Sequence, residues 1–164
     1  MGADFHSIFL LDSETATNEF AATLAPHLVA GDTLLLSGQI GAGKTHFARA
    51  LIQARLAAAD RMEDVPSPTF TLVQTYNDGL FELWHADLYR LSHVDEVLEL
   101  GLEAAFADAI TLIEWPDRLS GNHPSDALKL EFTVINDTSR RIDVSSVDRR
   151  WAGYFDTALA RANG

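Results

Sequence analysis

The sequence predicts an α/β protein with a mixed parallel and antiparallel sheet. A short apolar run, a glycine-rich turn and a helical pattern follow one another over residues 33–59, an order typical of α/β units. Two pairs of strand-like runs flank the turn sequences NDG and NDTS, which is typical of β-hairpins. The 164 residues contain no repeat and no long linker, so we expect a single domain over residues 1–164.

The composition excludes several classes of protein. With 24 Asp+Glu against 12 Lys+Arg, the net charge of -12 repels phosphate backbones, so we expect no free-standing binding to DNA or RNA. The absence of cysteine excludes disulfides and thiolate sites, and suits a reducing cytosol. Residues 1–11 carry only a short apolar run, so we expect neither a signal peptide nor a membrane span. These observations predict a cytoplasmic protein.

The first half of the chain predicts a helix, a strand and a second helix. The first helix is expected to be capped by Ser13 and to end before Gly31, because apolar residues recur every four positions: Phe20, Leu24 and Leu28. The run at residues 33–37 predicts a fully buried strand. Residues 46–59 carry apolar residues at helical spacing, which places the glycine-rich turn at the start of this helix.

The next segment predicts a hairpin and two short helices. Aromatic-rich runs at residues 70–76 and 80–86 flank NDG and predict an antiparallel pair of strands. Residues 92–100 predict a capped helix closed by Gly101, with further helix up to Phe106.

The C-terminal part predicts a strand, a second hairpin and a helical tail. The strand is expected at residues 109–115, the hairpin from residues 127–135 and 140–146, and the tail from Asp148 onward. A solvated basic face is favoured over a docking surface for an acidic partner or tRNA at four arginines: Arg140, Arg141, Arg149 and Arg150.

The turn SGQIGAGKT matches the phosphate-loop pattern GxxxxGK(S/T). Its glycines allow backbone amides to close around phosphate oxygens, Lys44 can neutralise the β and γ phosphates, and Thr45 can offer its hydroxyl to Mg²⁺. The alternative is a turn that only joins a strand to a helix. We expect a P-loop NTPase-like three-layer fold that binds a nucleoside triphosphate through nine consecutive residues: Gly38, Gln39, Ile40, Gly41, Ala42, Gly43, Lys44, Thr45 and His46.

Acidic residues at strand ends are the candidates for metal binding and catalysis. Glu114 ends a buried run and could hold the metal shell or orient water, or be an ordinary strand-end glutamate. Trp115 beside it could pack over the site or fill its rim. His85 and Asp87 lie on the same side of a strand, where they could bind metal, position a water or form a hydrogen-bonded pair.

The segment VPSPTFTL is a candidate switch. Its two prolines force extended geometry, and hydroxyls follow at Ser67, Thr69 and Thr71. Such a loop could report the γ-phosphate or Mg²⁺, or could be a rigid entry to a strand.

Five segments in this order resemble the TsaE (YjeE) family, the bacterial P-loop ATPases of threonylcarbamoyladenosine synthesis on tRNA: SGQIGAGKT, PSPTFTLV, HADLYRL, LGLEAAF and IEWPDRL. The resemblance covers about residues 13–119. It implies ATP and Mg²⁺ as ligands and a regulatory ATPase that is weak alone. It also implies a complex with the TsaB and TsaD proteins, through which tRNA is contacted indirectly.

The resemblance also implies roles for individual residues. Lys44, Asp87 and Glu114 become the predicted catalytic residues, and Thr45, Glu114 and Asp87 the predicted metal ligands. Asp87 and Glu114 remain interchangeable between metal binding and water orientation. Ser67 and Thr69, in the switch-like SPTF, and Trp115 join the predicted nucleotide site.

The chain departs from the family pattern inside the glycine-rich loop. Gln39 and Ile40 stand where Asp-Leu is commoner, and His46 stands where a small hydroxyl residue is more usual. The loss of a loop carboxylate can alter metal or partner contacts, while the backbone cradle should survive.

Two other functions use the same loop. A small-molecule kinase needs a pocket that aligns an acceptor hydroxyl, and the sequence shows no such motif. A nucleotide-gated binding module would use ATP only to order the 65–72 loop for a partner. Phosphate release and acceptor labelling separate these functions from an ATPase.

Overall fold

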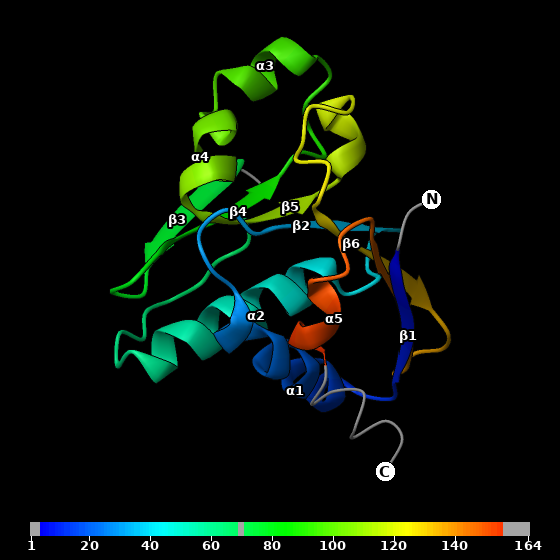
Figure 1. The fold of residues 1–164 in the computed structure, drawn as a ribbon. Coiled ribbons are helices and arrows are strands. Elements are labelled where there is room, and N and C mark those ends of the chain that lie inside the picture. The colour runs from blue at the N-terminus through cyan, green and yellow to red at the C-terminus, as the bar shows by residue number, and fades with distance from the viewer. Residues whose placement is uncertain (1–3, 69–70, 156–164) are drawn as a thin grey trace.

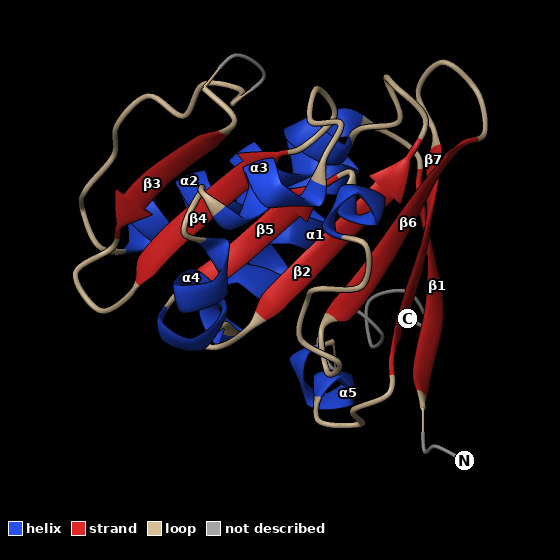
Figure 2. Cartoon of the chain, turned by 90° about the horizontal axis from the view of Figure 1, so that it is seen from above, coloured by secondary structure: helices blue, strands red, loops and turns tan. Residues whose placement is uncertain are grey.

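The computed structural model describes residues 4–68 and 71–155. Its strands form one sheet in the order β1-β7-β6-β2-β5-β4-β3 (Figures 1 and 2). The central strands β6, β2, β5 and β4 run parallel, whereas the β1/β7, β6/β7 and β3/β4 pairs are antiparallel. The predicted mixed sheet is therefore confirmed. The strand bounds are β1 Phe5–Leu11, β2 Thr33–Gly38, β3 Val73–Asn77, β4 Glu82–Asp87, β5 Ile110–Glu114, β6 Leu128–Val134 and β7 Arg140–Ser146.

Helices cover both faces of the sheet and make the fold three-layered. On one side lie α1, α2 and the short α5, and on the other lie α3 and α4 (Figure 1). Two 3-10 turns, η1 and η2, continue from α1 and β5. The bounds are α1 Glu14–Leu24, η1 Ala25–His27, α2 Lys44–Ala58, α3 Val94–Leu98, α4 Leu102–Asp108, η2 Pro116–Leu119 and α5 Trp151–Tyr154. None of the helices in the described ranges has the length and apolar character that a membrane span needs.

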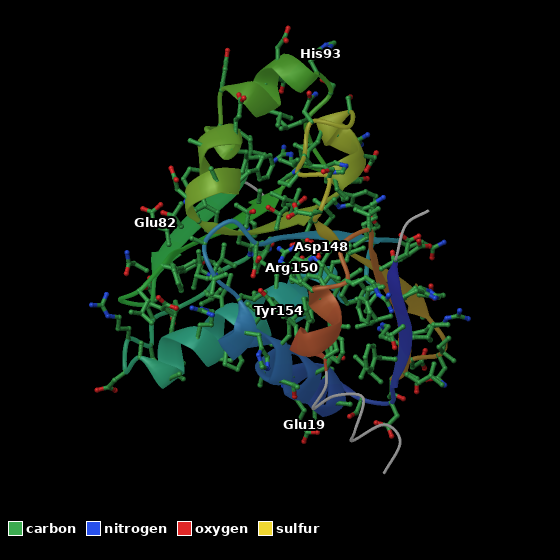
Figure 3. The ribbon with its side chains drawn as sticks, in the orientation of Figure 1. Glu19, Glu82, His93, Asp148, Arg150 and Tyr154 are labelled. Carbon is green, nitrogen blue, oxygen red and sulfur yellow. The ribbon has the colours of Figure 1, made fainter. Side chains whose placement is uncertain are left out.

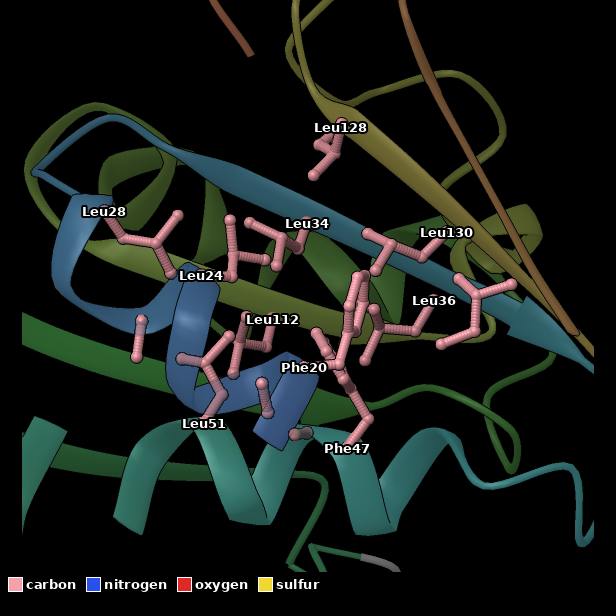
Figure 4. Packing of buried hydrophobic residues seen from close by; sticks show 14 of the residues in the cluster. Phe20, Leu24, Leu28, Leu34, Leu36, Phe47, Leu51, Leu112, Leu128 and Leu130 are labelled. Atoms are coloured by element: carbon pink, nitrogen blue, oxygen red, sulfur yellow. The ribbon is translucent and has the colours of Figure 1, made fainter. Parts of the chain in front are cut away.

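The larger core lies between the sheet and the helices α1 and α2 (Figure 4). Leu34 and Leu36 of β2 point into it, while Leu35 points into a smaller core on the opposite face. Strand β2 is thus buried on both sides, which is why its sequence is a continuous apolar run. Burying one leucine fully contributes about 1.5 to 3 kcal/mol, so β2 holds the glycine-rich turn on a rigid base.

Strand β1 was not predicted from the sequence. It pairs antiparallel with β7 at the edge of the sheet, with Phe5, Phe9 and Leu11 buried. Its other side leaves Ile8 and Leu10 exposed, at 45% and 75% of their surface. Apolar residues on both sides hide the alternation by which a half-buried strand is recognised.

The first helix begins as expected. The Ser13 side chain caps α1 by accepting a hydrogen bond from the backbone N–H of Ala16, at 3.0 Å. The α-helix ends at Leu24 and becomes a 3-10 turn containing Pro26. Leu28 lies beyond this turn in extended backbone, and it is buried although it is not on the helix.

Two predictions in the next segment need correction. The first hairpin consists of β3 and β4, which begin at Val73 and Glu82, later than expected, and Phe70 lies outside the described residues. The capped helix expected at residues 92–100 is shorter, because α3 spans Val94–Leu98 with His93 as its N-cap, and no side chain caps it. The Ser92 hydroxyl instead donates to the Glu96 carboxylate at 3.4 Å.

The C-terminal arginines do not form one solvated basic face. Arg150 donates to the carboxylates of Asp32 at 2.7 Å and Asp148 at 3.0 Å, and Tyr154 donates to Asp32 at 2.9 Å (Figure 3). This network ties the start of α5 to the turn before β2. The helical tail is confirmed only over Trp151–Tyr154, because residues 156–164 lie outside the described part of the chain.

Candidate functional site

The glycine-rich turn connects the end of β2 to the start of α2, in the centre of the sheet. Gly38, Gly41 and Gly43 have φ angles of 140°, 83° and 103°, which side chains rarely allow. A Cβ atom at Gly38 would also lie 2.6 Å from the carbonyl oxygen of Phe132 on β6. The loop conformation therefore requires glycine, and it directs the N-terminus of the 15-residue helix α2 toward one edge of the sheet.

A cavity of about 510 Å³ lies in front of this loop. Its size is in the range of sites that hold small molecules. The walls come from the loop, the start of α1, the ends of β4 and β5, and the β6–β7 hairpin. The lining residues are Ser13, Glu14, Thr17, Ile40, Gly41, Ala42, Gly43, Lys44, Thr45, His46, Asp87, Tyr89, Glu114, Trp115, Phe132, Asp137, Thr138 and Arg140.

Lys44 is the buried cation of the site. Its ammonium group donates to the backbone carbonyls of Gly38 and Gln39, the latter at 3.2 Å, and lies 3.9 Å from the centre of the Trp115 ring. Burial lowers the pKa of Lys44, and the nearby carboxylates of Glu114 and Asp87 partly oppose this effect. The loop carbonyls thus accept hydrogen bonds from the ammonium group, and the ring face stabilises its positive charge.

Glu114 joins the helix start to the neighbouring strand. Its Oε1 accepts from the Thr45 hydroxyl at 2.7 Å, and its Oε2 lies 2.7 Å from Nε2 of His85. Since an ionised carboxylate can only accept, the imidazole N–H is the donor in the second bond. His85 is completely buried and Glu114 is 2% exposed, so this chain of contacts fixes the carboxylate at the cavity wall.

Asp87 lies directly beside Glu114, because the two residues face each other in the parallel β4/β5 register. Its carboxylate accepts the backbone N–H of Tyr89 at 3.1 Å. Burial raises the pKa of Asp87, and the negative charge of Glu114 adds to the rise. Two carboxylates therefore stand side by side at the end of the cavity that holds Lys44.

The residues fit a bound nucleotide with Mg²⁺ better than a metal ion alone. In residues 4–68 and 71–155 no group of three or more His, Asp and Glu side chains is placed to hold an ion. Thr45 and Glu114 nevertheless bring a hydroxyl and a carboxylate together, the oxygen ligands that Mg²⁺ prefers. Such a partial set suits a cation that takes its remaining ligands from phosphates and water.

Most of the predicted site residues meet at the cavity. Residues 40–46 line it together with Asp87, Glu114 and Trp115. Gly38 and Gln39 contribute carbonyls to Lys44 but no surface of the cavity. Ser67 is exposed and does not line it, and Thr69 lies outside the described residues, so the switch role of this loop stays a prediction.

Sequence reasoning missed part of the wall and the partner of one histidine. His85 contacts Glu114 on β5 rather than Asp87 on its own strand, which the alternation along β4 alone did not reveal. Tyr89 was missed although it lies in the segment HADLYRL, two residues after Asp87. The other missed residues are distant from the predicted site in sequence, and only the fold brings them to the cavity: Ser13, Glu14, Thr17, Phe132, Asp137, Thr138 and Arg140.

Comparisons with known proteins give matches to one family. The model of a family described as threonylcarbamoyl adenosine biosynthesis protein TsaE matches residues 11–142. The chain is 35% identical to the tRNA threonylcarbamoyladenosine biosynthesis protein TsaE of Rickettsia bellii, covering 84% of this chain and 93% of that protein. It is 34% identical to the protein of the same name from Bacillus subtilis, covering 82% of each chain.

The fold also resembles a solved structure. Bacillus subtilis YdiB superimposes with a TM-score of 0.75 and 24% sequence identity, covering 100% of both chains. This likeness concerns the fold alone.

Proposed function

The chain belongs to the TsaE family of threonylcarbamoyl adenosine biosynthesis proteins, and we propose that it binds and hydrolyses ATP in the synthesis of threonylcarbamoyladenosine on tRNA. In this proposal it acts in the cytoplasm with the TsaB and TsaD proteins. ATP turnover supports or resets the transfer of the threonylcarbamoyl group to the adenosine next to the anticodon. The protein reaches tRNA indirectly, through that complex.

One observation carries the proposal. Thr45, at the start of α2, donates to Glu114, which His85 holds from the other side. This arrangement places a hydroxyl and an oriented carboxylate beside a phosphate-loop lysine, the set of groups that P-loop ATPases use. A loop that only joined a strand to a helix would not need a buried carboxylate fixed at both oxygens.

The loop and Lys44 would bind the phosphates. Backbone N–H groups of the loop and of the first turn of α2 provide donors, and the Lys44 ammonium provides a positive charge that stabilises the transferred phosphoryl group. Lys44 must exchange the carbonyls of Gly38 and Gln39 for phosphate oxygens when ATP enters. A bound Mg²⁺ would supply further neutralisation of phosphate charge, and Thr45 and Glu114 would hold it.

Asp87 would orient the attacking water. Water oxygen forms a bond to the γ-phosphorus, the bond from that phosphorus to the β–γ bridging oxygen breaks, and the water proton passes to the Asp87 carboxylate. The raised pKa of Asp87 suits a proton acceptor better than the pKa of an exposed aspartate would. Its place next to Glu114 gives the exchange of the two roles as the alternative assignment.

The first experiment follows the γ-phosphate of labelled ATP. It uses the protein alone, and then with the TsaB and TsaD proteins and tRNA of the same organism. We expect weak release of inorganic phosphate alone and a steep rise with the partners. Binding of ATP without release in either mixture would indicate a nucleotide-gated module, and label on another molecule would indicate a kinase.

Two substitutions separate binding from turnover. Lys44→Ala should weaken ATP binding, because it removes the buried positive charge of the loop. Asp87→Ala should retain ATP binding while partner-stimulated hydrolysis falls by about 10² to 10⁴, the usual contribution of a general base. Asp95→Ala, in the exposed first turn of α3, is the control. Normal hydrolysis by Asp87→Ala in the presence of the partners would show that the assignment of Asp87 is wrong.

A further inference from the structure

Arg140 reaches the phosphate loop from the β6–β7 hairpin. Strand β6 pairs in parallel with β2 up to the Gly38–Phe132 pair, so the hairpin continues past the end of β2, beside the loop (Figure 2). Arg140 is the first residue of β7, directly after the hairpin tip at residues 135–139. It lines the cavity together with Asp137 and Thr138 of the same tip.

The contacts of Arg140 are all to backbone carbonyls. Its Nη1 donates to Asn136 at 2.9 Å and to Ser139 at 3.0 Å, which fixes the guanidinium to the hairpin tip. Its Nη2 donates to the carbonyl of Gly41 in the phosphate loop at 3.4 Å, the longest of the three bonds. A Cβ atom at Gly43 would lie 4.0 Å from its Nε. The guanidinium therefore stands directly beside the loop.

The charge of Arg140 is not neutralised by an ion pair within the described residues. Other arginines of the chain have carboxylate partners: Arg55 pairs with Asp78, Arg141 with Asp143, and Arg150 with Asp32. Arginine normally directs its planar set of donors at carboxylates or phosphates. A half-buried guanidinium with only neutral acceptors beside a phosphate loop thus has an unused capacity to bind an anion.

The cavity wall carries more carboxylates than cationic side chains. Lys44 and Arg140 are the lysine and arginine side chains that line it, whereas four carboxylates do so: Glu14, Asp87, Glu114 and Asp137. A nucleoside triphosphate brings several further negative charges. Arg140 would therefore add positive charge beside Lys44 and a bound Mg²⁺, and so offset part of the repulsion from these four carboxylates.

We propose that Arg140 is a second phosphate-binding side chain, supplied by the β6–β7 hairpin. On nucleotide binding it exchanges the carbonyl of Gly41 for a phosphate oxygen while its Nη1 stays bonded to the hairpin tip. This inference rests on the proposed binding of ATP and adds a residue that the phosphate-loop motif does not contain.

The test compares ATP with inorganic tripolyphosphate, which has the phosphates but no nucleoside. Arg140→Gln should weaken binding of both by about ten-fold or more, because a charge-assisted hydrogen bond is lost. The affinity of Arg140→Lys for each probe should lie between those of the wild type and Arg140→Gln, since lysine keeps the charge without the planar set of donors. Arg141 is exposed, and neither it nor its partner Asp143 lines the cavity, so Arg141→Gln should bind both probes as the wild type does.

Each outcome decides the proposal. Unchanged affinity of Arg140→Gln for ATP overturns it, and so does a loss of affinity for ATP but not for tripolyphosphate, which would indicate a nucleoside contact. If Arg140 only tied the hairpin together, Arg140→Lys would bind as weakly as Arg140→Gln, because lysine cannot replace the paired Nη1 bonds. A wild-type protein that bound neither probe would overturn the proposed function as well, which distinguishes the two failures.

Discussion

Glu114 shows how single side chains prepare the site without a ligand. Its two oxygens accept from Thr45 and His85, so neighbours on α2 and β4 fix the orientation of the carboxylate group. A carboxylate held in this way loses little conformational freedom when a ligand binds. The oriented carboxylate is therefore a property of the folded protein, independent of nucleotide.

Replacing His85 should reduce catalysis more than binding. His85→Ala leaves Oε2 of Glu114 without its buried donor, and loss of such a supporting residue typically costs about 10- to 100-fold in activity. We expect that drop in partner-stimulated ATP hydrolysis, with ATP affinity nearly unchanged. His85→Gln, whose amide N–H can donate, should recover part of the rate. His93→Gln, in the exposed start of α3, is the control (Figure 3).

Two glycines with positive φ separate backbone strain from steric clash. Gly121→Ala places its Cβ in open space, so only the φ of 85° opposes it, at a cost of about 1 to 2 kcal/mol. Gly38→Ala has a φ of 140°, farther from the range that L residues adopt, and in addition a Cβ 2.6 Å from the Phe132 carbonyl. Urea unfolding should show a larger loss in the free energy of unfolding for Gly38→Ala than for Gly121→Ala. Equal losses would mean that the Phe132 carbonyl on β6 can move away from the added Cβ at little cost, and that β6 does not confine the loop.

At the scale of elements, one buried arginine connects three segments. Arg55 on α2 donates to the carboxylate of Asp78 in the β3–β4 turn at 2.7 Å, and to the carbonyls of Ala25 at 2.6 Å and Leu28 at 3.0 Å beside η1. Both ionic partners are almost fully buried, at 7% and 5% side-chain exposure. Helix α2, which begins at the phosphate loop, is thereby anchored at its far end.

Breaking this buried pair should be costly. Arg55→Met leaves the Asp78 carboxylate buried without its cation, which typically destabilises a protein by about 3 to 5 kcal/mol. Arg141→Met removes the exposed pair with Asp143 and should cost less than about 1 kcal/mol. Urea unfolding at pH 7 measures both. A small loss for Arg55→Met would mean that Asp78 is satisfied by the backbone alone.

The same pair gives a prediction about pH. Burial alone would raise the pKa of Asp78, but the backbone N–H groups of Phe81 and Leu80 and the Arg55 guanidinium outweigh it and lower the pKa. Because the folded pKa lies below the unfolded value, this stabilisation is present above about pH 4 and is lost as the pH falls through the folded pKa. Asp78→Asn should therefore unfold at a lower urea concentration than the wild type at pH 7, and the difference in urea midpoint should shrink below pH 4. A difference independent of pH would contradict an ionised Asp78.

At the scale of the whole molecule, charge limits what the protein can bind alone. The chain carries a net charge of -12, and carboxylates neutralise several of its arginines. Arg140, the cation beside the loop that lacks a carboxylate partner in the described residues, faces the cavity. The net charge thus opposes direct binding of tRNA by this protein alone, which is consistent with the proposed indirect contact.

The isolated protein should therefore not bind tRNA at physiological salt. Repulsion between its acidic surface and the phosphate backbone removes the electrostatic attraction on which non-specific binding depends. Fluorescence anisotropy of labelled tRNA should stay constant as the protein is added, and rise when the TsaB and TsaD proteins are also present. A salt-sensitive rise with this protein alone would contradict indirect recognition.

The sequence by itself determined the parts of this protein that depend on local order. The glycine spacing, Lys44 and Thr45 predicted a phosphate loop between β2 and α2, because such a loop is continuous in the chain. Apolar runs and turn residues likewise predicted the central strands and both hairpins. Five ordered segments indicated the family that the comparisons show.

Only the tertiary structure decided which distant residues meet. Strand order placed β5 on one side of β2 and β6 on the other, which brought Glu114 to Thr45 and Arg140 to Gly41. Pairing across strands, rather than alternation along one, gave His85 its partner. The edge strand β1 depended on β7 for its position, since its own pattern is apolar on both sides. These contacts follow from register and packing between elements, which periodicity within an element does not specify.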